Sequence, residues 1–205
     1  MIRVRLQKRG LALLSVLACF FASARAQDSD ATSLNASGQI VVNGRATAYL
    51  IRHLPVNAFP QLPLPIQQEL TRRGCLIPQS YEARGPENVV NASLQSPGSS
   101  DWAVLCTTGK NVSLLVFFSG AGSDPTVLAT ALETERLQLT GSGKPLGFNW
   151  AIDPASPQQI RQAQLGMKRI PPRPDHDALA DSTLDQRTVY HFFTNNAWIL
   201  LDTHD

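Results

Sequence analysis

The sequence predicts an α+β domain, mostly antiparallel β-sheet with two or three short helices, stapled by one disulfide. Short β-rich runs alternate with turn residues, as is typical of neighbouring antiparallel strands. Two segments carry helix-capping residues, and two cysteines remain after a predicted leader. No internal repeat is visible, which excludes a solenoid or a full propeller. We therefore expect one α+β domain over residues 39–205.

Residues 1–26 are predicted to form a cleavable signal peptide. The segment opens with a basic region and continues with an apolar core over residues 11–21. An A-x-A cleavage site, Ala24-Arg25-Ala26, precedes Gln27. The apolar run is about half of the roughly 20 residues that a membrane helix needs, and no later segment is long and apolar enough. We expect an exported protein, periplasmic or extracellular, without a transmembrane helix.

Cys19 allows an alternative processing of the leader, in which the chain is lipidated instead of being cleaved after Ala26. Val16-Leu17-Ala18-Cys19 loosely resembles the lipidation motif of bacterial lipoproteins, and lipidation would tether the chain through Cys19. The bulky Leu17 and the following Phe20-Phe21 fit that processing poorly, whereas the A-x-A site fits ordinary cleavage well. We expect ordinary cleavage, with a lipid anchor as the alternative.

Removal of the leader changes the net charge of the chain. The full sequence has 18 basic and 16 acidic residues, a net charge of +2. Five basic residues and no acid lie in residues 1–26, so 13 basic and 16 acidic residues remain, a net charge of −3. The basic surplus is therefore a targeting feature, and nucleic-acid binding is excluded. Candidate partners are an envelope protein or a small-molecule ligand.

The cysteines predict a disulfide. Cys19 leaves with the leader, so Cys75 and Cys106 remain as an even pair in an oxidising compartment. A metal or redox pair lacks support, because the sequence has no C-x-x-C motif and no clustered histidines. We expect a structural disulfide and predict no cofactor.

The first half of the chain contains a hairpin and a helix. Residues 27–38 are small, polar and acidic and read as a flexible tail. Two β-rich runs over residues 39–54 flank Asn43-Gly44, a strong hairpin turn signal. A helix then starts near Pro65 and ends before Gly74, which occupies the usual left-handed position after a helix.

The second half predicts further strands and a second helix. Residues 127–139 fit either a helix or strands. Ser156-Pro157 opens a helix that reaches about Leu165, because serine is a good N-cap and proline suits the first helical position. The predicted strands cover residues 88–94, 102–106, 112–118 and 148–152, and the closing hairpin pairs residues 188–193 with 198–201.

A series of short motifs resembles a family of uncharacterised exported bacterial proteins. The resemblance covers most of the chain after the leader and implies a common fold and a bacterial, exported setting. It implies no activity. The motifs are the segments 74–79, 86–90, 101–106 and 114–117, the segment Asp175-His176-Asp177-Ala178, and the terminal Trp198-x-x-Leu201.

The densest polar cluster is Asp175-His176-Asp177, which follows a proline-rich lead-in. A histidine flanked by carboxylates can bind a ligand, hold a metal or transfer a proton, and a paired aspartate, here Asp177, would keep its ring in one tautomer. The alternative is structural, with the aspartates capping a solvated loop. We take His176 and Asp177 as candidate ligand-site residues.

Asp101 is the third candidate residue. Residues 91–105 are similar to one blade motif of integrin-type propeller repeats, in which loop carboxylates bind calcium. Here Asp101 is the single acid left in that loop, whereas calcium takes about six or more oxygen ligands. We expect neither a propeller nor a calcium site and retain Asp101 as a candidate for another ligand.

Other motifs are weaker. Residues 139–144 lack the residues of a phosphate-binding loop, and Ser119 lacks the glycines of a hydrolase nucleophile elbow. Trp102, Trp150 and Trp198 form either a ligand-stacking platform or parts of the core; core packing is expected for Trp102 and Trp198.

The function predicted from these features is that of an exported, non-catalytic envelope accessory or binding domain. The alternative is an envelope enzyme of the hydrolase type that uses His176 with a neighbouring aspartate. A cleft that brings a second histidine or Ser119 within hydrogen-bond reach of His176 would favour the enzyme, and a flat or convex polar surface there would favour the binding domain.

Overall fold

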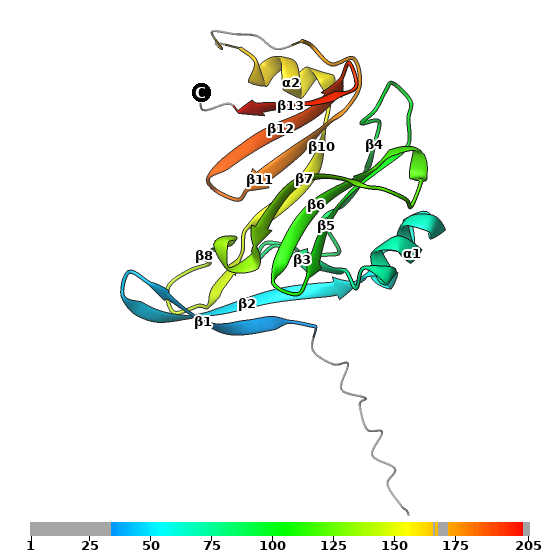
Figure 1. Ribbon diagram of the computed structural model, residues 1–205. Coiled ribbons are helices and arrows are strands. Elements are labelled where there is room, and N and C mark those ends of the chain that lie inside the picture. The colour runs from blue at the N-terminus through cyan, green and yellow to red at the C-terminus, as the bar shows by residue number, and fades with distance from the viewer. Residues whose placement is uncertain (1–33, 166, 168–171, 203–205) are drawn as a thin grey trace, which may run out of the picture. The chain divides into compact units, whose positions relative to one another are not determined.

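The computed structural model describes residues 34–165, 167 and 172–202 (Figure 1). They belong to one compact unit that begins at Ser33. The predicted signal peptide, with Cys19 and its lipidation motif, lies outside the described residues. Strand β1 (Ala36–Val42) starts inside the segment 27–38 that the sequence assigned to a flexible tail, so the tail prediction is wrong from Ala36 onward.

Two β-sheets make up most of the unit. The larger sheet has the strand order β7-β6-β5-β3-β2-β9-β8, with β1 added to β2 and β4 added to β5. The smaller sheet has the order β10-β11-β12-β13. Their bounds are β2 (Arg45–Pro55), β3 (Leu76–Gln79), β4 (Val89–Ala92), β5 (Asp101–Thr108), β6 (Asn111–Phe117), β7 (Thr126–Leu132), β8 (Leu137–Leu139), β9 (Leu146–Phe148), β10 (Trp150–Ala155), β11 (Ala178–Thr183), β12 (Arg187–Thr194) and β13 (Ala197–Asp202).

The pairing is antiparallel throughout the described strands except between β2 and β9, which run parallel. The prediction of a mostly antiparallel sheet with two helices and one disulfide is therefore confirmed. Strands account for 49% and helices, with the 3-10 segments included, for 15% of the described residues, so the helical part of the α+β class is small. The three short 3-10 segments are η1 (Val56–Ala58), η2 (Phe118–Gly120) and η3 (Glu133–Glu135).

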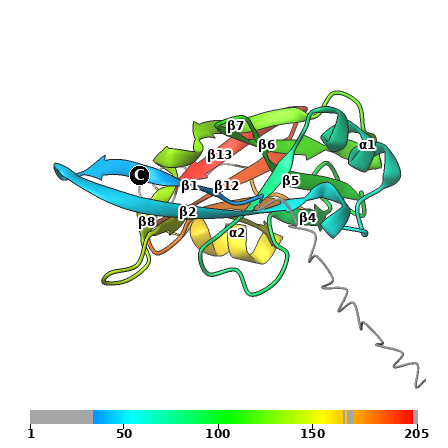
Figure 2. The same cartoon turned by 90° about the horizontal axis from the view of Figure 1, so that it is seen from below.

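Both α-helices begin and end close to the capping residues identified in the sequence. Helix α1 (Leu64–Arg72) has proline in its first turn and is followed by Gly74 at a φ of 69°. Helix α2 (Pro157–Ala163) begins after Ser156, whose side chain accepts a hydrogen bond from the Gln159 amide at 3.3 Å. Figure 2 shows α1 and α2 on separate parts of the unit, α1 beside the larger sheet and α2 beside the smaller.

The two predicted hairpins are present. Val42 pairs with Arg45, and the two loop residues Asn43 and Gly44 have φ values of 50° and 77°. The β12–β13 hairpin has the same two-residue loop, with Asn195 and Asn196 at 50° and 58°. Positive φ at both loop positions is the type I′ geometry that matches the twist of antiparallel strands.

The structure decides one segment that the sequence left open and adds a strand that the sequence did not predict. The ambiguous segment 127–139 forms β7 and β8 with η3 between them, and no α-helix. Strand β11 was not predicted, because Ala, Asp and Ser give its sequence little intrinsic β-propensity. It is nevertheless paired on both sides, with β10 and with β12, so hydrogen bonds to distant segments decide its conformation.

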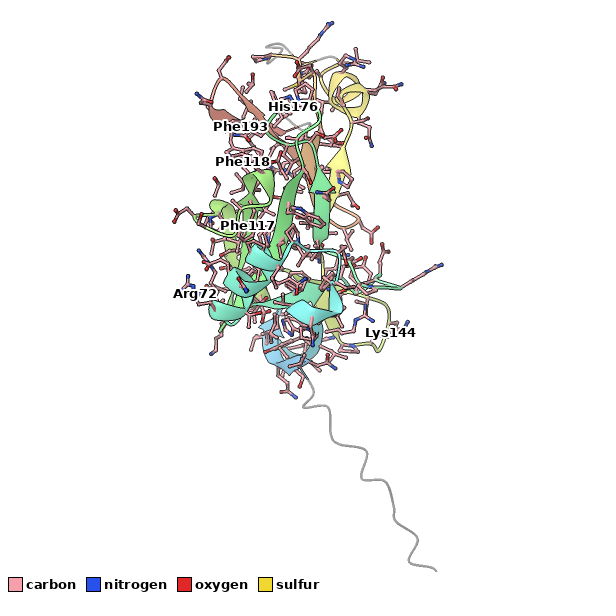
Figure 3. All side chains as sticks on the ribbon, turned by 90° about the vertical axis from the view of Figure 1, so that its right-hand side faces the viewer. Arg72, Phe117, Phe118, Lys144, His176 and Phe193 are labelled. Atoms are coloured by element: carbon pink, nitrogen blue, oxygen red, sulfur yellow. A yellow bond between two sulfur atoms is a disulfide. The ribbon has the colours of Figure 1, made fainter. Side chains whose placement is uncertain are left out.

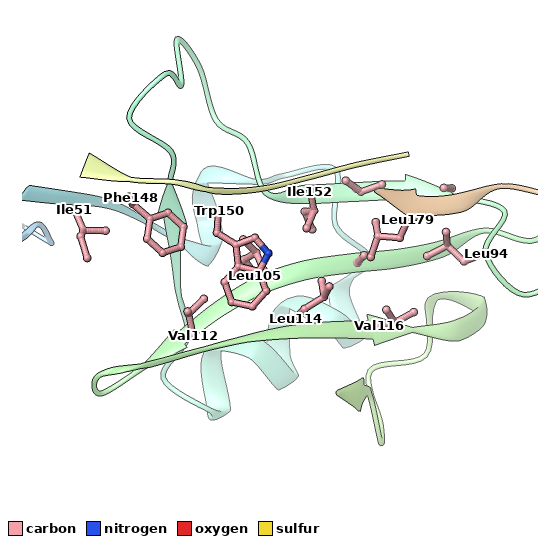
Figure 4. Close-up of a cluster of buried hydrophobic side chains, with 13 residues drawn as sticks. Ile51, Leu94, Leu105, Val112, Leu114, Val116, Phe148, Trp150, Ile152 and Leu179 are labelled. Carbon is pink, nitrogen blue, oxygen red and sulfur yellow. The ribbon is translucent and has the colours of Figure 1, made fainter. Parts of the chain in front are cut away.

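The central strands β5 and β6 are buried on both faces. On one face, Leu105 and Leu114 pack with Phe148, Trp150 and Ile152 of β9 and β10 (Figure 4). The opposite faces of β5 and β6 pack against helix α1 in a second cluster that includes the Cys75–Cys106 disulfide. A third cluster joins helix α2 to the smaller sheet.

Candidate functional site

His176 lies in the segment just before β11 and is only 8% exposed. Its Nδ1 is 2.8 Å from Oδ1 of Asp175, which is the carboxylate that orients the ring. The expected partner, Asp177, does not contact the ring. Its Oδ2 accepts a hydrogen bond from the Ser93 amide at 3.1 Å instead. The aspartate that contacts the ring is therefore Asp175 and not Asp177.

The other ring nitrogen of His176 has no partner. Nε2 is buried from solvent and has no hydrogen bond to any described residue. A buried polar atom left without a partner costs about 1–3 kcal/mol, so such atoms in native proteins commonly serve a ligand or a bound water. Neither Ser119 nor a second histidine therefore contacts His176, and the geometric condition for the hydrolase is not met among the described residues.

His176 lines a surface pocket of about 270 Å³. Three loops form this pocket, which we call the His176 pocket: the loop between β4 and β5, the segment before β11, and the turn of the β12–β13 hairpin. Figure 3 shows His176 and Phe193 near one another, with Phe118 beside them. The lining residues are Gln95, Ser96, Pro97, Asp175, His176, Phe193, Thr194, Asn195 and Asn196.

Asp101 shapes one of these loops without lining the pocket. Its side chain is fully buried at the start of β5. Oδ2 accepts hydrogen bonds from the amides of Leu94 and Gln95 at 2.9 and 2.8 Å and from the Ser99 hydroxyl. Oδ1 accepts from the Ser119 amide at 2.8 Å. Because both oxygens are occupied, Asp101 is a positioning residue and not a ligand-binding group.

The three predicted site residues thus meet around one pocket in different roles. His176 lines it, Asp177 ties the segment before β11 to Ser93 at the end of β4, and Asp101 folds the loop that supplies Gln95 and Ser96. The capping role of Asp177 matches the structural alternative considered for the sequence. Asp175 has its pKa lowered, chiefly by the hydrogen bond to His176, and its side chain is 80% exposed.

A ring cluster supports the apolar wall of the His176 pocket. The centroid of the Phe193 ring is 5.0 Å from that of Phe118 and 5.4 Å from that of Trp198. These spacings suit aromatic contacts, and the tilted geometry holds the Phe193 ring in place. Trp198 therefore supports the pocket from behind instead of forming a stacking surface of its own.

Sequence reasoning missed a buried cluster around Asp181. The Asp181 carboxylate accepts a 2.6 Å hydrogen bond from Trp150 Nε1 and lies 3.0 Å from His191 Nε2. The Arg136 guanidinium stands 4.0 Å from the centre of the Trp150 ring, and burial lowers its pKa. The hydrogen bonds of this cluster join β10, β11 and β12 of the smaller sheet, and Arg136 adds a contact from the segment before β8. Trp150 is a core residue.

A second pair, His53 and Glu133, is also structural. His53 Nε2 is 2.6 Å from Glu133 Oε1, and its Nδ1 is 2.8 Å from the Leu34 carbonyl oxygen. Thr107 donates to the same carboxylate oxygen at 2.7 Å. The three side chains are buried and lie far apart in sequence, so the contacts hold the start of the described chain and η3 against β5.

A cationic cleft of about 380 Å³ lies between β2, β3 and β9. Arg52 and Lys144 line it, and no acidic residue does. Figure 3 places Lys144 well away from His176. Gly147 and Tyr81 also line the cleft. The Tyr81 side chain lies so close to Gly147 that a Cβ added to Gly147 would be 2.4 Å from Tyr81 Cβ. Lys144 belongs to the segment 139–144, which lacks the residues of a phosphate-binding loop.

No protein-family model matches the chain, and neither curated proteins nor solved structures give a significant match. Within residues 34–165, 167 and 172–202, no group of three or more His, Cys, Asp or Glu residues is arranged to hold a metal ion. None of the helices in that part of the chain is long and apolar enough to cross a membrane.

Proposed function

We propose that the protein is an exported, non-catalytic binding domain whose ligand site is the His176 pocket. One observation carries the proposal. The His176 pocket brings five uncharged polar side chains of two loops together beside the His176 ring, which Asp175 contacts at Nδ1. Uncharged donors and acceptors that converge on a pocket are suited to hold and orient a ligand.

Export is part of this proposal. The basic region, apolar core and A-x-A site of residues 1–26 support it. The Cys75–Cys106 disulfide is compatible with it, because disulfides persist in oxidising compartments and are rare in the cytosol of mesophiles.

The hydrolase alternative has one favourable feature, the Asp175–His176 pair. It lacks a nucleophile, since no described serine, threonine or cysteine contacts Nε2. Asp175 is also 80% exposed, and a solvated carboxylate stabilises an imidazolium far less than a buried one does. We expect no His176-dependent hydrolysis of p-nitrophenyl esters, and turnover that a His176→Phe substitution removes would favour the enzyme.

A thermal-shift screen tests the binding function. The mature protein is melted with separate sets of sugars, amines, amino acids, organic acids and nucleotides. A compound at ten times its Kd adds about 1.4 kcal/mol of stability, which raises the Tm of a domain of this size by roughly 3–6 °C. We expect at least one set to give such a shift in the wild type and a smaller one in Asn196→Gly.

Asn196→Gly suits this screen because glycine favours the positive φ of 58° while it removes the pocket amide. Asn43→Gly is the matched control, since Asn43 has the same turn geometry in the β1–β2 hairpin and does not line the His176 pocket. If no compound class distinguishes the two variants, the His176 pocket is not a ligand site.

A further inference from the structure

The His176 ring is held in place at the edge of the pocket. Its Nδ1 is 2.8 Å from Oδ1 of Asp175, and its Nε2 has almost no solvent-accessible surface. A ligand must therefore find its hydrogen bonds on the other polar side chains of the pocket.

The charge of the His176 pocket argues against an anionic ligand. Asp175 and His176 are the only titratable residues among its lining, and it has no lysine or arginine. A phosphate or carboxylate would meet the Asp175 carboxylate without a permanent cation to offset the repulsion. The cleft at Arg52 and Lys144 has the opposite character, with two cations and no acid.

Five uncharged polar side chains line the same pocket, and none of them has a side-chain hydrogen bond to the pocket's other described residues. Gln95, Asn195 and Asn196 contribute amides, each with donors and an acceptor, and Ser96 and Thr194 contribute hydroxyls. Adjacent donors and acceptors of this kind match the paired hydroxyls of a sugar ring. The type I′ turn fixes the backbone of both asparagines, so the ligand has only their side chains to order.

The remaining wall is apolar and fixed. Phe193 is half-buried, and its ring is packed between Phe118 and Trp198. Pro97 lines the pocket from the β4–β5 loop. A fixed aromatic ring beside uncharged polar groups suits a ligand with one C–H face and several hydroxyls.

From these features we infer that the His176 pocket binds a neutral saccharide, with sugar hydroxyls on the polar side chains of residues 95–96 and 194–196 and a sugar ring against Phe193. The inference rests on the proposed binding function and names its ligand class. The volume of about 270 Å³ is near the lower end of ligand pockets, about 300 Å³, so one sugar ring fills it and further rings of an oligosaccharide extend into solvent.

Protein-detected NMR titration tests the inference on the mature, oxidised protein. The probes are chitotriose and maltotriose, with ethanolamine and inorganic phosphate as amine and anion probes. We expect a trisaccharide to shift the amide signals of residues 95–96 and 193–196 and the ring signals of His176. Sugar C–H protons should move upfield, because they lie over the Phe193 ring.

Two variants locate the binding. Asn196→Gly should weaken trisaccharide binding about threefold to tenfold, the range expected for one lost hydrogen bond, and Asn43→Gly should leave it unchanged. His176→Phe replaces the imidazole by a larger apolar ring that Asp175 cannot hold by a hydrogen bond, and it should weaken trisaccharide binding. The amide spectrum of each variant without ligand shows whether its fold is retained, and Asn196→Gly carries the test if His176→Phe does not fold.

The possible results separate the inference from the function it rests on. If ethanolamine or phosphate gives shifts that depend on Asn196 and the sugars give none, the saccharide inference is wrong while the binding function stands. If sugars shift only signals around Arg52 and Lys144, the assigned place is wrong. If no probe shifts these signals and the thermal screen is also empty, both are wrong. Co-sedimentation with peptidoglycan sacculi distinguishes a wall glycan from a soluble sugar as the source.

Discussion

Reduction of the Cys75–Cys106 disulfide is expected to lower the free energy of unfolding by about 3.7 kcal/mol at 25 °C. The two cysteines are separated by 31 residues. The chain-entropy relation for a closed loop of that length gives a loss of about 12 cal/mol/K in the unfolded state, which is the source of this value. For a domain of this size, each kcal/mol shifts the Tm by roughly 2–4 °C, so the expected decrease is about 7–15 °C.

Circular dichroism melting of the mature protein with and without a phosphine reductant measures the shift. The Cys75→Ala/Cys106→Ala variant should lose more, because both sulfurs are buried and their packing adds roughly 1 kcal/mol each, as for a buried methylene. A decrease below about 2 °C after complete reduction would refute the entropic reasoning. Two free thiols in the native exported protein would show that the link is absent.

Three further outcomes are expected. The exported protein should have an intact mass that begins at Gln27, and a diacylglyceryl group would establish the tethered form instead. Burial and the hydrogen bond to Asp185 raise the pKa of Tyr81 to about 12, so its contribution to stability is complete below about pH 10 and is lost as the pH rises through 12. Absorbance titration should show one late-titrating tyrosine, and Asp185→Asn should lower its pKa; an unchanged value would contradict the assignment. Gly147→Ala should cost about 1–3 kcal/mol in chemical denaturation, whereas Gly85→Ala, with open space around it, should be nearly neutral.

The candidate site was partly predictable. His176 was identified because a histidine between two acids is uncommon in a chain with four histidines. Which acid binds the ring was not predictable, because Asp175 and Asp177 have the same chemistry and differ only in direction along an irregular segment. Asp177 faces Ser93, which lies 84 residues earlier in the chain. The polar lining from residues 194–196 was not predicted, since a hairpin turn carries no signal of what stands opposite it.

The sequence by itself determined the features that depend on neighbouring residues. Asn43-Gly44, Ser156-Pro157 and Gly74 specify their turn and helix ends through local φ preferences and capping bonds. Only the tertiary structure decided β11, the sharing of Asp181 between Trp150 and His191, and the meeting of three loops at His176. These features consist of hydrogen bonds and packing between residues that are distant in sequence, and such contacts override the weak local preference of each segment for a conformation.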